Sequence, residues 1–518
     1  MLSFNQQQIL DGFRFHPFLL SLLGLLSLSF VAKRLYINPS LISTKKLPPS
    51  PPKLPVLGNL HQLSTLTHRS FQSLGAKHGP LMLLHFGNKP VIIVQSADAA
   101  KEIMKTNDIV FADKPHTRTA RRFFYELRDI SVAPYGEYWR KLKSICVLQL
   151  LSSKRVQSFG FIREEETSLL MEKINKLSKN LELVNLSELF VSVTNDVICR
   201  AVFGRKYGEG EGGKRFLMLL RKVVEYMGSV SIGEFVPWLS WINYVTGFHR
   251  RVDKAAREVD GFLEMVVQEH MLINEGVRIS RDESRENFVD ILMNLYKDDK
   301  SGVSVDRDGI KAIILDIIAG GTDTSAATLE WTMSELLRHP IALKTLQNEV
   351  REITRGKNII TENDLVKMHY LRAVVKETLR LHPPVPLLVR VARENIKVMG
   401  YDISIGTMVL TNTWAIGRDP DSWNEPEKFM PERFLTSSVD FKGLDFELIP
   451  FGAGRRGCPG IVFAMVGVEL VLANVVKKFE WELPKGTTCE NLDMTEQPGF
   501  TTHMKNPLLA VATPCYNF

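Results

Sequence analysis

One cysteine, Cys458, stands in the glycine-rich, basic stretch PFGAGRRGCPG at residues 450–460. The four glycines of this stretch allow the backbone to approach a flat object closely. Arg455 and Arg456 supply positive charge that would lower the pKa of the thiol. The apolar segment that follows, from Ile461 to Phe479, is compatible with a helix whose dipole would also favour the thiolate. A thiolate in such a loop is a metal ligand or a nucleophile.

Four interpretations of Cys458 are open at this point. An isolated cysteine can be an inert core residue. A nucleophile would need a histidine base, and no histidine lies near Cys458 in the sequence. Zinc would need three further ligands, but the other cysteines have no paired spacing. An axial haem ligand needs only this one sulfur.

The stretch resembles the haem-binding signature of the cytochromes P-450, Phe-x-x-Gly-x-Arg-x-Cys-x-Gly. The signature is met by Phe451, Gly454, Arg456, Cys458 and Gly460. The resemblance implies a haem whose iron takes the Cys458 thiolate as its axial ligand, with Phe451, Arg456 and Gly460 contacting the cofactor. It also implies a mainly α fold with small β-sheets (α+β), in a single catalytic domain behind an N-terminal transmembrane anchor. Other motifs extend it over essentially the whole chain.

A second motif, PYGEYWR at residues 134–140, opens an expected helix. Trp139 and Lys143 are four residues apart and therefore share one face of that helix. In the family this helix lies beside the haem propionates, and the second position is usually arginine. The resemblance therefore implies that Trp139 and Lys143 contact haem, with Lys143 acting as a point charge. The basic residues 140–143 suit a solvated face or a docking surface for an acidic flavoprotein reductase equally well.

Helical periodicity over residues 311–337 is interrupted by AGGTDT at 319–324. Two glycines within a helix cost about 1 kcal/mol each relative to alanine, so a reason should exist. The resemblance supplies one, because the family's long distal helix is kinked here to make an oxygen pocket. Asp323 and Thr324 match the acid–alcohol pair that steers protons to bound dioxygen, and Ala319 and Gly320 would line the substrate pocket. The alternative is a helix cap beside a packing pair of glycines.

A third pattern contains charged residues that are expected to stabilise the cysteine loop. Glu377 and Arg380 lie three residues apart on an expected helix, where they can pair. Together with Arg433 they match the family's buried structural triad. Breaking such a network leaves an uncompensated buried charge, so we expect its loss to release haem.

The segment after Pro383-Pro384 departs from the family pattern. Relatives usually carry Val-Pro-Arg, with the arginine bonding a haem propionate, whereas this chain has Val-Arg-Val at 389–391. Either Arg390 or Arg393 takes that task, or it is lost, and we favour Arg390. The resemblance also implies that five residues of this segment and of the C-terminal region face the substrate: Leu387, Leu388, Val389, Phe500 and Thr501.

Local patterns predict the elements that position these residues. The segment LMLLHFGNKPVIIV at 81–94 predicts two short strands around a Gly-Asn turn. Helical spacing dominates the rest, as at 164–177 and 254–274. The run EGEGG at 209–213 predicts a flexible loop between helices. The aromatic run FVPWLSW at 235–241 can be core, although in the family this region dips into the bilayer.

The composition limits the classes of molecule that the protein is expected to bind. The 518 residues carry a net charge of +7 and a pI near 9.0. No basic run with interleaved aromatics supports nucleic-acid binding, so a membrane surface or an acidic protein partner fits the charge better. Five cysteines without framework spacing favour a reducing compartment and no disulfides. With no phosphate-binding glycine motif after a strand, we expect electrons from a membrane-bound NADPH–cytochrome P-450 reductase.

The N-terminus predicts a membrane anchor. Residues 17–32 are apolar apart from serines, which approaches the roughly 20 residues of a bilayer-spanning helix. Lys33 and Arg34 follow directly, so the positive-inside rule puts the short N-terminus in the lumen and the body in the cytosol. We therefore expect an anchor at 1–32, a basic and proline-rich linker at 33–60, and a haem-binding monooxygenase domain at 61–518. The expected location is the endoplasmic reticulum membrane, crossed once.

Together these patterns resemble the plant microsomal branch of the family. They predict a monooxygenase that uses O2 to hydroxylate or otherwise oxidise a hydrophobic small molecule, such as a terpenoid, a phenylpropanoid or coumarin, or an alkaloid. The alternatives are a non-oxygenating haem enzyme such as an aldoxime dehydratase, and a non-catalytic haem-binding protein.

Overall fold

The computed structural model describes residues 21, 24–27, 29, 45–207, 210–229, 231–274, 286–297 and 305–515. The chain divides into two units, Met1–Lys46 and Leu47–Phe518. The expected membrane anchor falls in the first unit and lies almost entirely outside the described residues. The proline-rich part of the expected linker belongs to the second unit, where Leu83 N donates a 2.8 Å hydrogen bond to Pro49 O.

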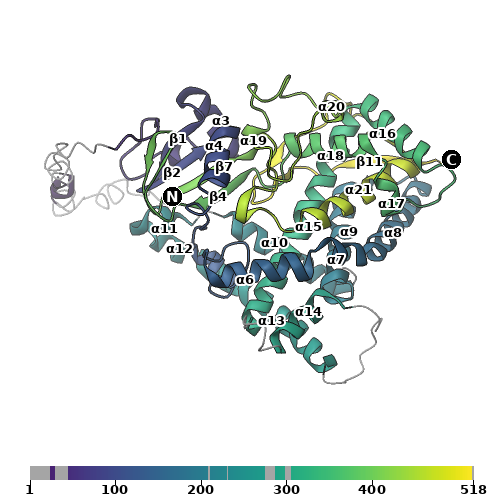
Figure 1. The fold of residues 1–518 in the computed structure, drawn as a ribbon, viewed down its shortest axis with the longest axis horizontal. Coiled ribbons are helices and arrows are strands. Elements are labelled where there is room, and N and C mark those ends of the chain that lie inside the picture. The colour runs from purple at the N-terminus through teal and green to yellow at the C-terminus, as the bar shows by residue number, and fades with distance from the viewer. Residues whose placement is uncertain are drawn as a thin grey trace, which may run out of the picture. The chain divides into compact units, whose positions relative to one another are not determined.

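The second unit is mainly helical (Figure 1). Its α-helices are α3 Thr67–His78, α4 Ala97–Lys101, α5 Arg118–Phe123, α6 Glu137–Ile145, α7 Ser153–Ser158, α8 Gly160–Lys179, α9 Leu186–Phe203, α10 Gly210–Gly228, α11 Ile232–Phe235, α12 Trp241–Val245, α13 Phe248–Asn274, α14 Phe288–Lys297, α15 Arg307–Arg338, α16 Pro340–Ile353, α17 Glu362–Leu365, α18 His369–Leu381, α19 Thr413–Ile416, α20 Arg433–Thr436 and α21 Ile461–Lys478. Short 3-10 or π turns are η1 Leu60–Gln62, η2 Glu102–Thr106, η3 Cys146–Leu150, η4 Pro237–Leu239 and η6 Gly454–Arg456.

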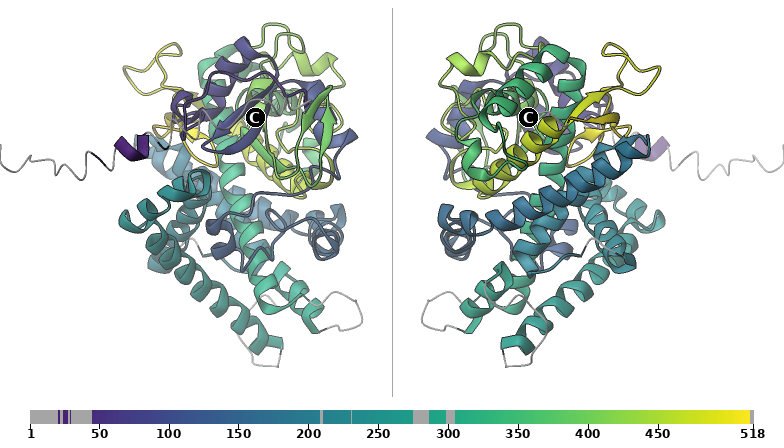
Figure 2. Two further views of the ribbon diagram at one scale, coloured as in Figure 1. Left: turned by 90° about the vertical axis from the view of Figure 1, so that its left-hand side faces the viewer. Right: turned by 90° about the vertical axis from the view of Figure 1, so that its right-hand side faces the viewer.

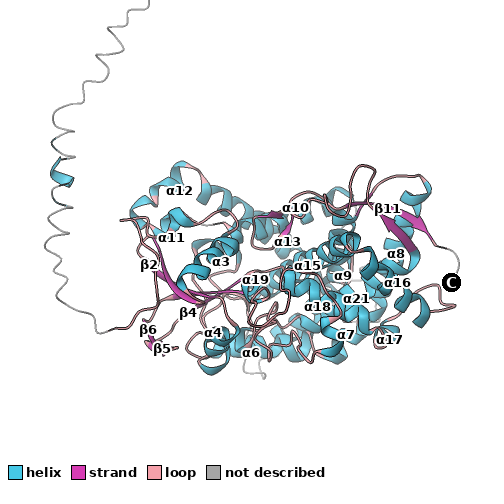
Figure 3. Ribbon diagram, turned by 90° about the horizontal axis from the view of Figure 1, so that it is seen from above, coloured by secondary structure: helices cyan, strands magenta, loops and turns pink. Residues whose placement is uncertain are grey.

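Four small sheets accompany the helices. The strands are β1 Leu81–Phe86, β2 Lys89–Val94, β3 Val184–Asn185, β4 Leu387–Val391, β5 Ile396–Val398, β6 Tyr401–Ile403, β7 Met408–Asn412, β8 Phe479–Glu482, β9 Glu496–Gln497, β10 His503–Met504 and β11 Leu509–Pro514. The largest sheet has the order β1-β2-β7-β4, in which only β2 and β7 run parallel. Figures 1 and 3 show this sheet at one side of the unit and helices α8, α9, α15 and α21 at the other.

Helix α15 is the longest described helix and passes through the core beside α9 and α21 (Figures 1 and 3). It begins where the Asp306 side chain accepts a 2.9 Å hydrogen bond from Gly309 N, a standard N-cap. It ends before the His339-Pro340 pair, because the residue before a proline disfavours the helical region. Within the described residues it is the one helix long and apolar enough to cross a membrane, and 61% of its most apolar window is buried inside the protein.

Most of the local predictions are confirmed. Strands β1 and β2 meet around Gly87, whose φ of +59° is left-handed. Helices α8 and α13 cover the two periodic segments, and all five cysteines are unpaired. The predicted loop at 209–213 is wrong from Gly210 onward, because α10 begins there. The periodic apolar residues that follow extend the helix back over glycines, which carry only a propensity cost.

The aromatic run forms short turns of helix (α11, η4 and α12) and is only partly core. Phe235 packs against Phe86 and Val236 is buried beside Gly87, whereas Trp238 and Trp241 are 61% and 57% exposed. The 27-residue helix α13 follows this run in the chain, and teal helices project at the bottom of both views in Figure 2.

Candidate functional site

The Cys458 loop is held in shape by its own backbone. Cys458 N donates to Phe451 O at 2.9 Å, and Gly460 N points at Cys458 Sγ at 3.4 Å. Gly454 has a φ of +66°, and a Cβ there would meet Met104 O at 2.3 Å, so only glycine fits. Helix α21 then begins at Ile461. The loop therefore presents one exposed sulfur at the N-terminal end of a long helix.

The pKa of the Cys458 thiol is raised, contrary to the expectation from its basic neighbours. The side chain reaches solvent, but the protein atoms packed around Sγ desolvate it and raise its pKa. The Gly460 N–H and the charge of Lys143 act in the opposite direction. The expectation that Arg455 and Arg456 lower this pKa is wrong, because both guanidinium groups are engaged elsewhere.

Arg455 and Arg456 brace the loop instead. Arg455 donates to Asp108 Oδ2 from its backbone N at 3.0 Å and from Nη1 at 2.8 Å. Arg456 Nε donates to Ala112 O at 2.6 Å, and its guanidinium carbon lies 4.2 Å from the centre of the Trp139 ring. Trp139 Nε1 itself donates to Ile130 O at 2.9 Å. These contacts fix the loop against the segment before α6 and against α6.

Further cations approach the same loop from other elements. Lys143, on α6, donates from Nζ to Gly457 O at 2.7 Å. Arg390, on β4, is buried and donates from Nη2 to Ala453 O at 2.9 Å. Desolvation and the charges of Arg390 and Arg456 lower the pKa of Lys114 to about 7, against the opposing pull of Asp129. Burial is the larger cause, and the contributions of Arg390 and Arg456 show that Lys114 lies within reach of their positive charges.

The sequence left open whether Arg390 or Arg393 takes the propionate contact, and the two side chains have different surroundings in the structure. Arg390 Nη1 is buried without a hydrogen-bond partner among the described residues, and lies 3.9 Å from Asp108 Oδ1. Burial lowers the pKa of Arg390 to about 10. Arg393 is directed elsewhere, with Nε 3.4 Å from Asp113 Oδ2 and its guanidinium over the Tyr135 ring. Arg390 is thus the one that faces the loop with an unused donor.

Glu377, Arg380 and Arg433 come together in a buried network. Arg380 donates from Nε and Nη2 to the two oxygens of Glu377, each at 2.7 Å. Arg433 Nε donates to Glu377 Oε1 at 3.0 Å, and Met430 N donates to the same oxygen at 2.8 Å. Arg380 also donates to the carbonyl oxygens of Gly417, Pro426 and Lys428. The network ties α18 to the segment that leads into the Cys458 loop.

The AGGTDT stretch lies within the continuous helix α15. A Cβ on Gly321 would meet Ile198 Cδ1 of α9 at 2.6 Å, whereas one on Gly320 would meet nothing within 4 Å. Thr324 donates from Oγ1 to Gly320 O at 2.5 Å. Gly321 therefore packs against α9, while Gly320 leaves open space on its side of the helix.

The five substrate-facing candidates outside α15 do not share one surface. On β4, Leu387 and Val389 pack against the core cluster around Phe71, whereas Leu388 packs with Ala453 of the cysteine loop. This follows from the alternation of side chains along a strand. Phe500 is 44% exposed, and Thr501 is buried. Only Leu388 among the β4 trio is thus on the side of the cysteine loop.

The donor set at Cys458 fits haem better than a bare metal ion. The described part of the chain contains no group of three or more His, Cys, Asp or Glu side chains placed to hold a metal. A metal at Cys458 must therefore bring its other ligands, as haem does with its four pyrrole nitrogens. The cations beside the loop and the unused donor of Arg390 fit the two propionates of that cofactor.

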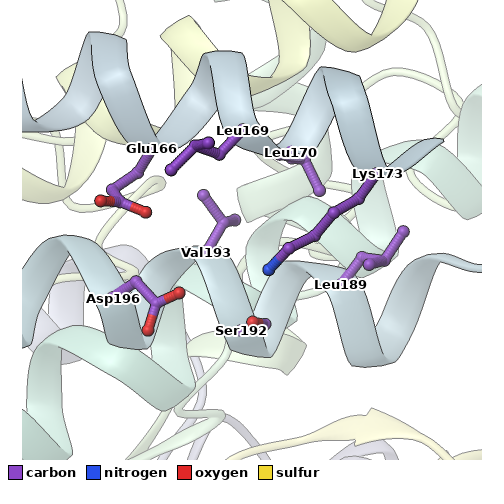
Figure 4. Close-up of a pocket in the computed structure, with 8 residues that line it drawn as sticks. All are labelled: Glu166, Leu169, Leu170, Lys173, Leu189, Ser192, Val193 and Asp196. Atoms are coloured by element: carbon purple, nitrogen blue, oxygen red, sulfur yellow. The ribbon is translucent and has the colours of Figure 1, made fainter. Parts of the chain in front are cut away.

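A crevice between α8 and α9 offers no second site (Figure 4). Its free space is about 10 Å³, roughly that of one water molecule. Glu166 in its wall is already paired with Arg200 and Lys206.

Two groups near the site were not identified from the sequence. Lys114 is a single lysine in a loop, and nothing in its surroundings along the chain marks it. His503 reaches Asp323 across a separation of 180 residues, which no local pattern could reveal.

Comparisons with known proteins agree with this geometry. The family profile described as Cytochrome P450 matches residues 48–511. The chain is 54% identical to cytochrome P450 71A8 of Mentha piperita, with 95% of each chain covered. It is 51% identical to (+)-menthofuran synthase of the same plant, over 92% of this chain and 94% of that protein. A zebra fish cytochrome P450 solved with abiraterone matches the fold with a TM-score of 0.72 at 23% identity, covering 87% of this chain and 100% of that one.

Proposed function

The chain belongs to the cytochrome P450 family, and we propose that it is a membrane-bound enzyme that oxidises a hydrophobic plant specialised metabolite with electrons from NADPH–cytochrome P450 reductase. The family membership makes it a haem-thiolate monooxygenase. The substrate class, the reductase, the location at the endoplasmic reticulum and the roles of individual residues are our proposal. The observation that carries it is the single exposed Cys458 sulfur in a loop surrounded by cations.

Haem, when bound, supplies the iron at which dioxygen is activated. Cys458 would hold it, with the Gly460 N–H directed at the sulfur. We assign the propionates to Arg390, Lys143 and Trp139, and we add Lys114 to this proposal because the charges of Arg390 and Arg456 act on it. Phe451 and Arg456 shape the loop that carries the ligand.

Asp323 and Thr324 would supply protons on the distal side. Asp323 is partly buried in α15, and Thr324 returns its hydroxyl to the Gly320 carbonyl, where a small rotation would free it. A carboxylate and an alcohol placed together can pass a proton from solvent into the site. Ala319 and Gly320 border the open side of the same helix.

We place the substrate among apolar side chains. Leu388 lies next to the cysteine loop, and Phe500 and Thr501 lie next to α10 and α15. An apolar lining with few polar groups suits a hydrophobic small molecule. One relative, (+)-menthofuran synthase, is named for making a small furan, which is consistent with a product of that size.

The decisive experiment reconstitutes the full-length protein in vesicles with the reductase and offers 7-ethoxycoumarin, a panel of terpenoid, coumarin and alkaloid compounds, and an aldoxime. We expect product that requires NADPH, reductase and O2 together, with one oxygen atom from labelled O2 in hydroxylated products. Turnover of an aldoxime without O2 would instead support a non-oxygenating haem enzyme. Haem loading without turnover of any compound and without NADPH-dependent O2 consumption would support a non-catalytic haem protein.

A further inference from the structure

His503 joins two carboxylates of α15 that are separated along the helix. Its Nε2 lies 3.1 Å from Asp323 Oδ1, and its Nδ1 lies 3.2 Å from Glu330 Oε2. Carboxylates only accept hydrogen bonds, so both ring nitrogens must carry protons to use both contacts. The ring is therefore an imidazolium fixed at both ends.

The electrostatics agree with this geometry. Burial acts against a charged ring, but the hydrogen bonds and charges of Asp323 and Glu330 outweigh it and raise the pKa of His503 to about 10. For Asp323, burial acts to raise the pKa, but His503, with Thr501 and Arg221 of α10, lowers it below its usual value. Each partner holds the other in its charged form.

Glu330, the second carboxylate, is itself immobilised. Ser187, at the start of α9, donates from its hydroxyl to Glu330 Oε1, and Met504 N donates to Glu330 Oε2 at 3.2 Å. Leu508 N in turn donates to Ser187 Oγ at 2.8 Å. His503 therefore contacts a carboxylate, that of Glu330, whose position is fixed by α9, α15 and the C-terminal strands.

The two carboxylate oxygens of Asp323 have different surroundings. Its Oδ1 is taken by His503, whereas Oδ2 is buried and, among the described residues, has no partner at full hydrogen-bond geometry. The Thr501 hydroxyl lies close enough to the Asp323 carboxylate to help lower its pKa. A carboxylate held by one oxygen presents the other in a fixed direction. Without His503, Asp323 would lose the largest of the interactions that oppose its burial and would keep only those of Thr501 and Arg221, which shifts the balance toward its neutral form.

We propose that His503 is a positioning residue for proton delivery, which holds Asp323 ionised and oriented by bridging it to Glu330. This inference rests on the proposed function, because it assigns Asp323 to the protons of the oxygen reaction. His503 itself transfers no proton. It acts through Asp323, which it contacts directly.

The test compares wild type with His503→Gln, which keeps one hydrogen bond and loses the charge, and His503→Lys, which keeps the charge. Oxidation of 7-ethoxycoumarin is driven either by NADPH, reductase and O2, or by hydrogen peroxide, which brings its own two protons and two electrons and yields one water. We expect His503→Gln to lower NADPH-driven turnover by roughly tenfold or more, to raise its solvent isotope effect, and to leave peroxide-driven turnover near wild type. His503→Lys should recover most of the loss.

A second readout needs no turnover. Because the folded pKa of His503 lies above the unfolded value of 6.5, its stabilisation is complete below pH 6.5 and is lost as the pH rises toward 10. The melting temperature of wild type should therefore fall relative to that of His503→Gln across this range. His339→Gln is the matched control, because His339 pairs with Glu335 at the far end of the same helix and its pKa is also raised. It should leave the ratio of NADPH-driven to peroxide-driven turnover unchanged.

The outcomes separate cleanly. Equal loss of both turnovers in His503→Gln, or no loss of either, overturns the inference. If His503→Gln does not load haem, Glu330→Gln and His503→Lys carry the same comparison. A wild type that shows neither kind of turnover with 7-ethoxycoumarin or with any compound of the panel contradicts the proposed function. A melting temperature with no His503-dependent slope then contradicts the bridge itself.

Discussion

Lys114, Lys143, Arg390 and Arg456 converge on the Cys458 loop from three other parts of the chain and from the loop itself. Most of their bonds go to backbone carbonyls rather than to carboxylates. Burial lowers the pKa values of Arg390 and Arg456 to about 10 each. Such an arrangement is costly in free energy unless an anion joins it. At the residue scale, we propose the haem propionates as the anions that complete it.

The residue-scale prediction is a difference between two neighbouring arginines. Arg390→Met should lower the haem content of the purified protein several-fold, because it removes a buried donor that faces the loop. Arg393→Met should change it little, because Arg393 pairs with Asp113 and lies over Tyr135. Haem per protein, measured as the pyridine haemochrome, decides between them. Equal losses in the two variants would contradict our assignment of Arg390.

At the scale of elements, helix α15 has one side that faces open space, at Gly320, and one side that packs against α9, at Gly321. Gly320 and Gly321 are adjacent but have different surroundings, since only Gly321 meets α9. Alanine substitution of each glycine therefore tests separately the open side of the helix at Gly320 and the packing against α9 at Gly321.

Gly320→Ala should stabilise the protein by about 1 kcal/mol or be neutral, because alanine is the better helix former and has open space there. Gly321→Ala should be less stable than Gly320→Ala, because Ile198 must move aside for the new methyl group. Thermal unfolding followed by circular dichroism measures both. If Gly321→Ala were instead the more stable of the two variants, the open space would not be beside Gly320.

Helix α21 contains a buried carboxyl group with a testable pH dependence. Burial raises the pKa of Glu469 to about 7, against the opposing charge of Arg372. Between pH 4.5 and 7 the folded protein binds the proton that the unfolded chain releases, so Glu469 reduces stability as the pH rises. Glu469→Gln should match wild type near pH 4.5 and melt at a higher temperature at pH 8. An equal difference at both pH values would contradict this.

The sequence predicted the elements of this region better than the contacts between them. Strands β1 and β2, helix α15 and the start of α21 follow from periodicity, turn residues and glycine content. The pairing of Glu377 with Arg380 follows from helical spacing. The bridge from Asp323 to His503 and the approach of Lys114 could not be predicted, because they join segments far apart in the chain. The pKa of Cys458 was predicted in the wrong direction, because neighbours in sequence such as Arg455 turn toward Asp108.

At the scale of the whole molecule, the chain consists of a short N-terminal unit and a large unit that contains every residue of the candidate site. The apolar run at 17–32 belongs to the first unit. The large unit presents the exposed Trp238 and Trp241, which suit a shallow contact with lipid. We therefore expect firm attachment through the first unit and weak attachment through the second.

A chain that lacks residues 1–46 should be extracted from membranes by alkaline carbonate, whereas the full chain should resist extraction, because only a spanning helix holds a protein under these conditions. Changing Trp238 and Trp241 to serine in the shortened chain should further lower its binding to vesicles. Carbonate-resistant attachment of the shortened chain would contradict the placement of the anchor.

The central claim is that Cys458 binds haem through its thiolate. The most direct measurement is the carbon-monoxide difference spectrum of the reduced full-length protein, wild type beside Cys458→Ala, with Cys489→Ala as the control for loss of another partly exposed cysteine. We expect the strongly red-shifted Soret band of thiolate-ligated haem in wild type and in Cys489→Ala, and its complete absence in Cys458→Ala. The same band in Cys458→Ala, or no such band in well-expressed wild type, would contradict the account.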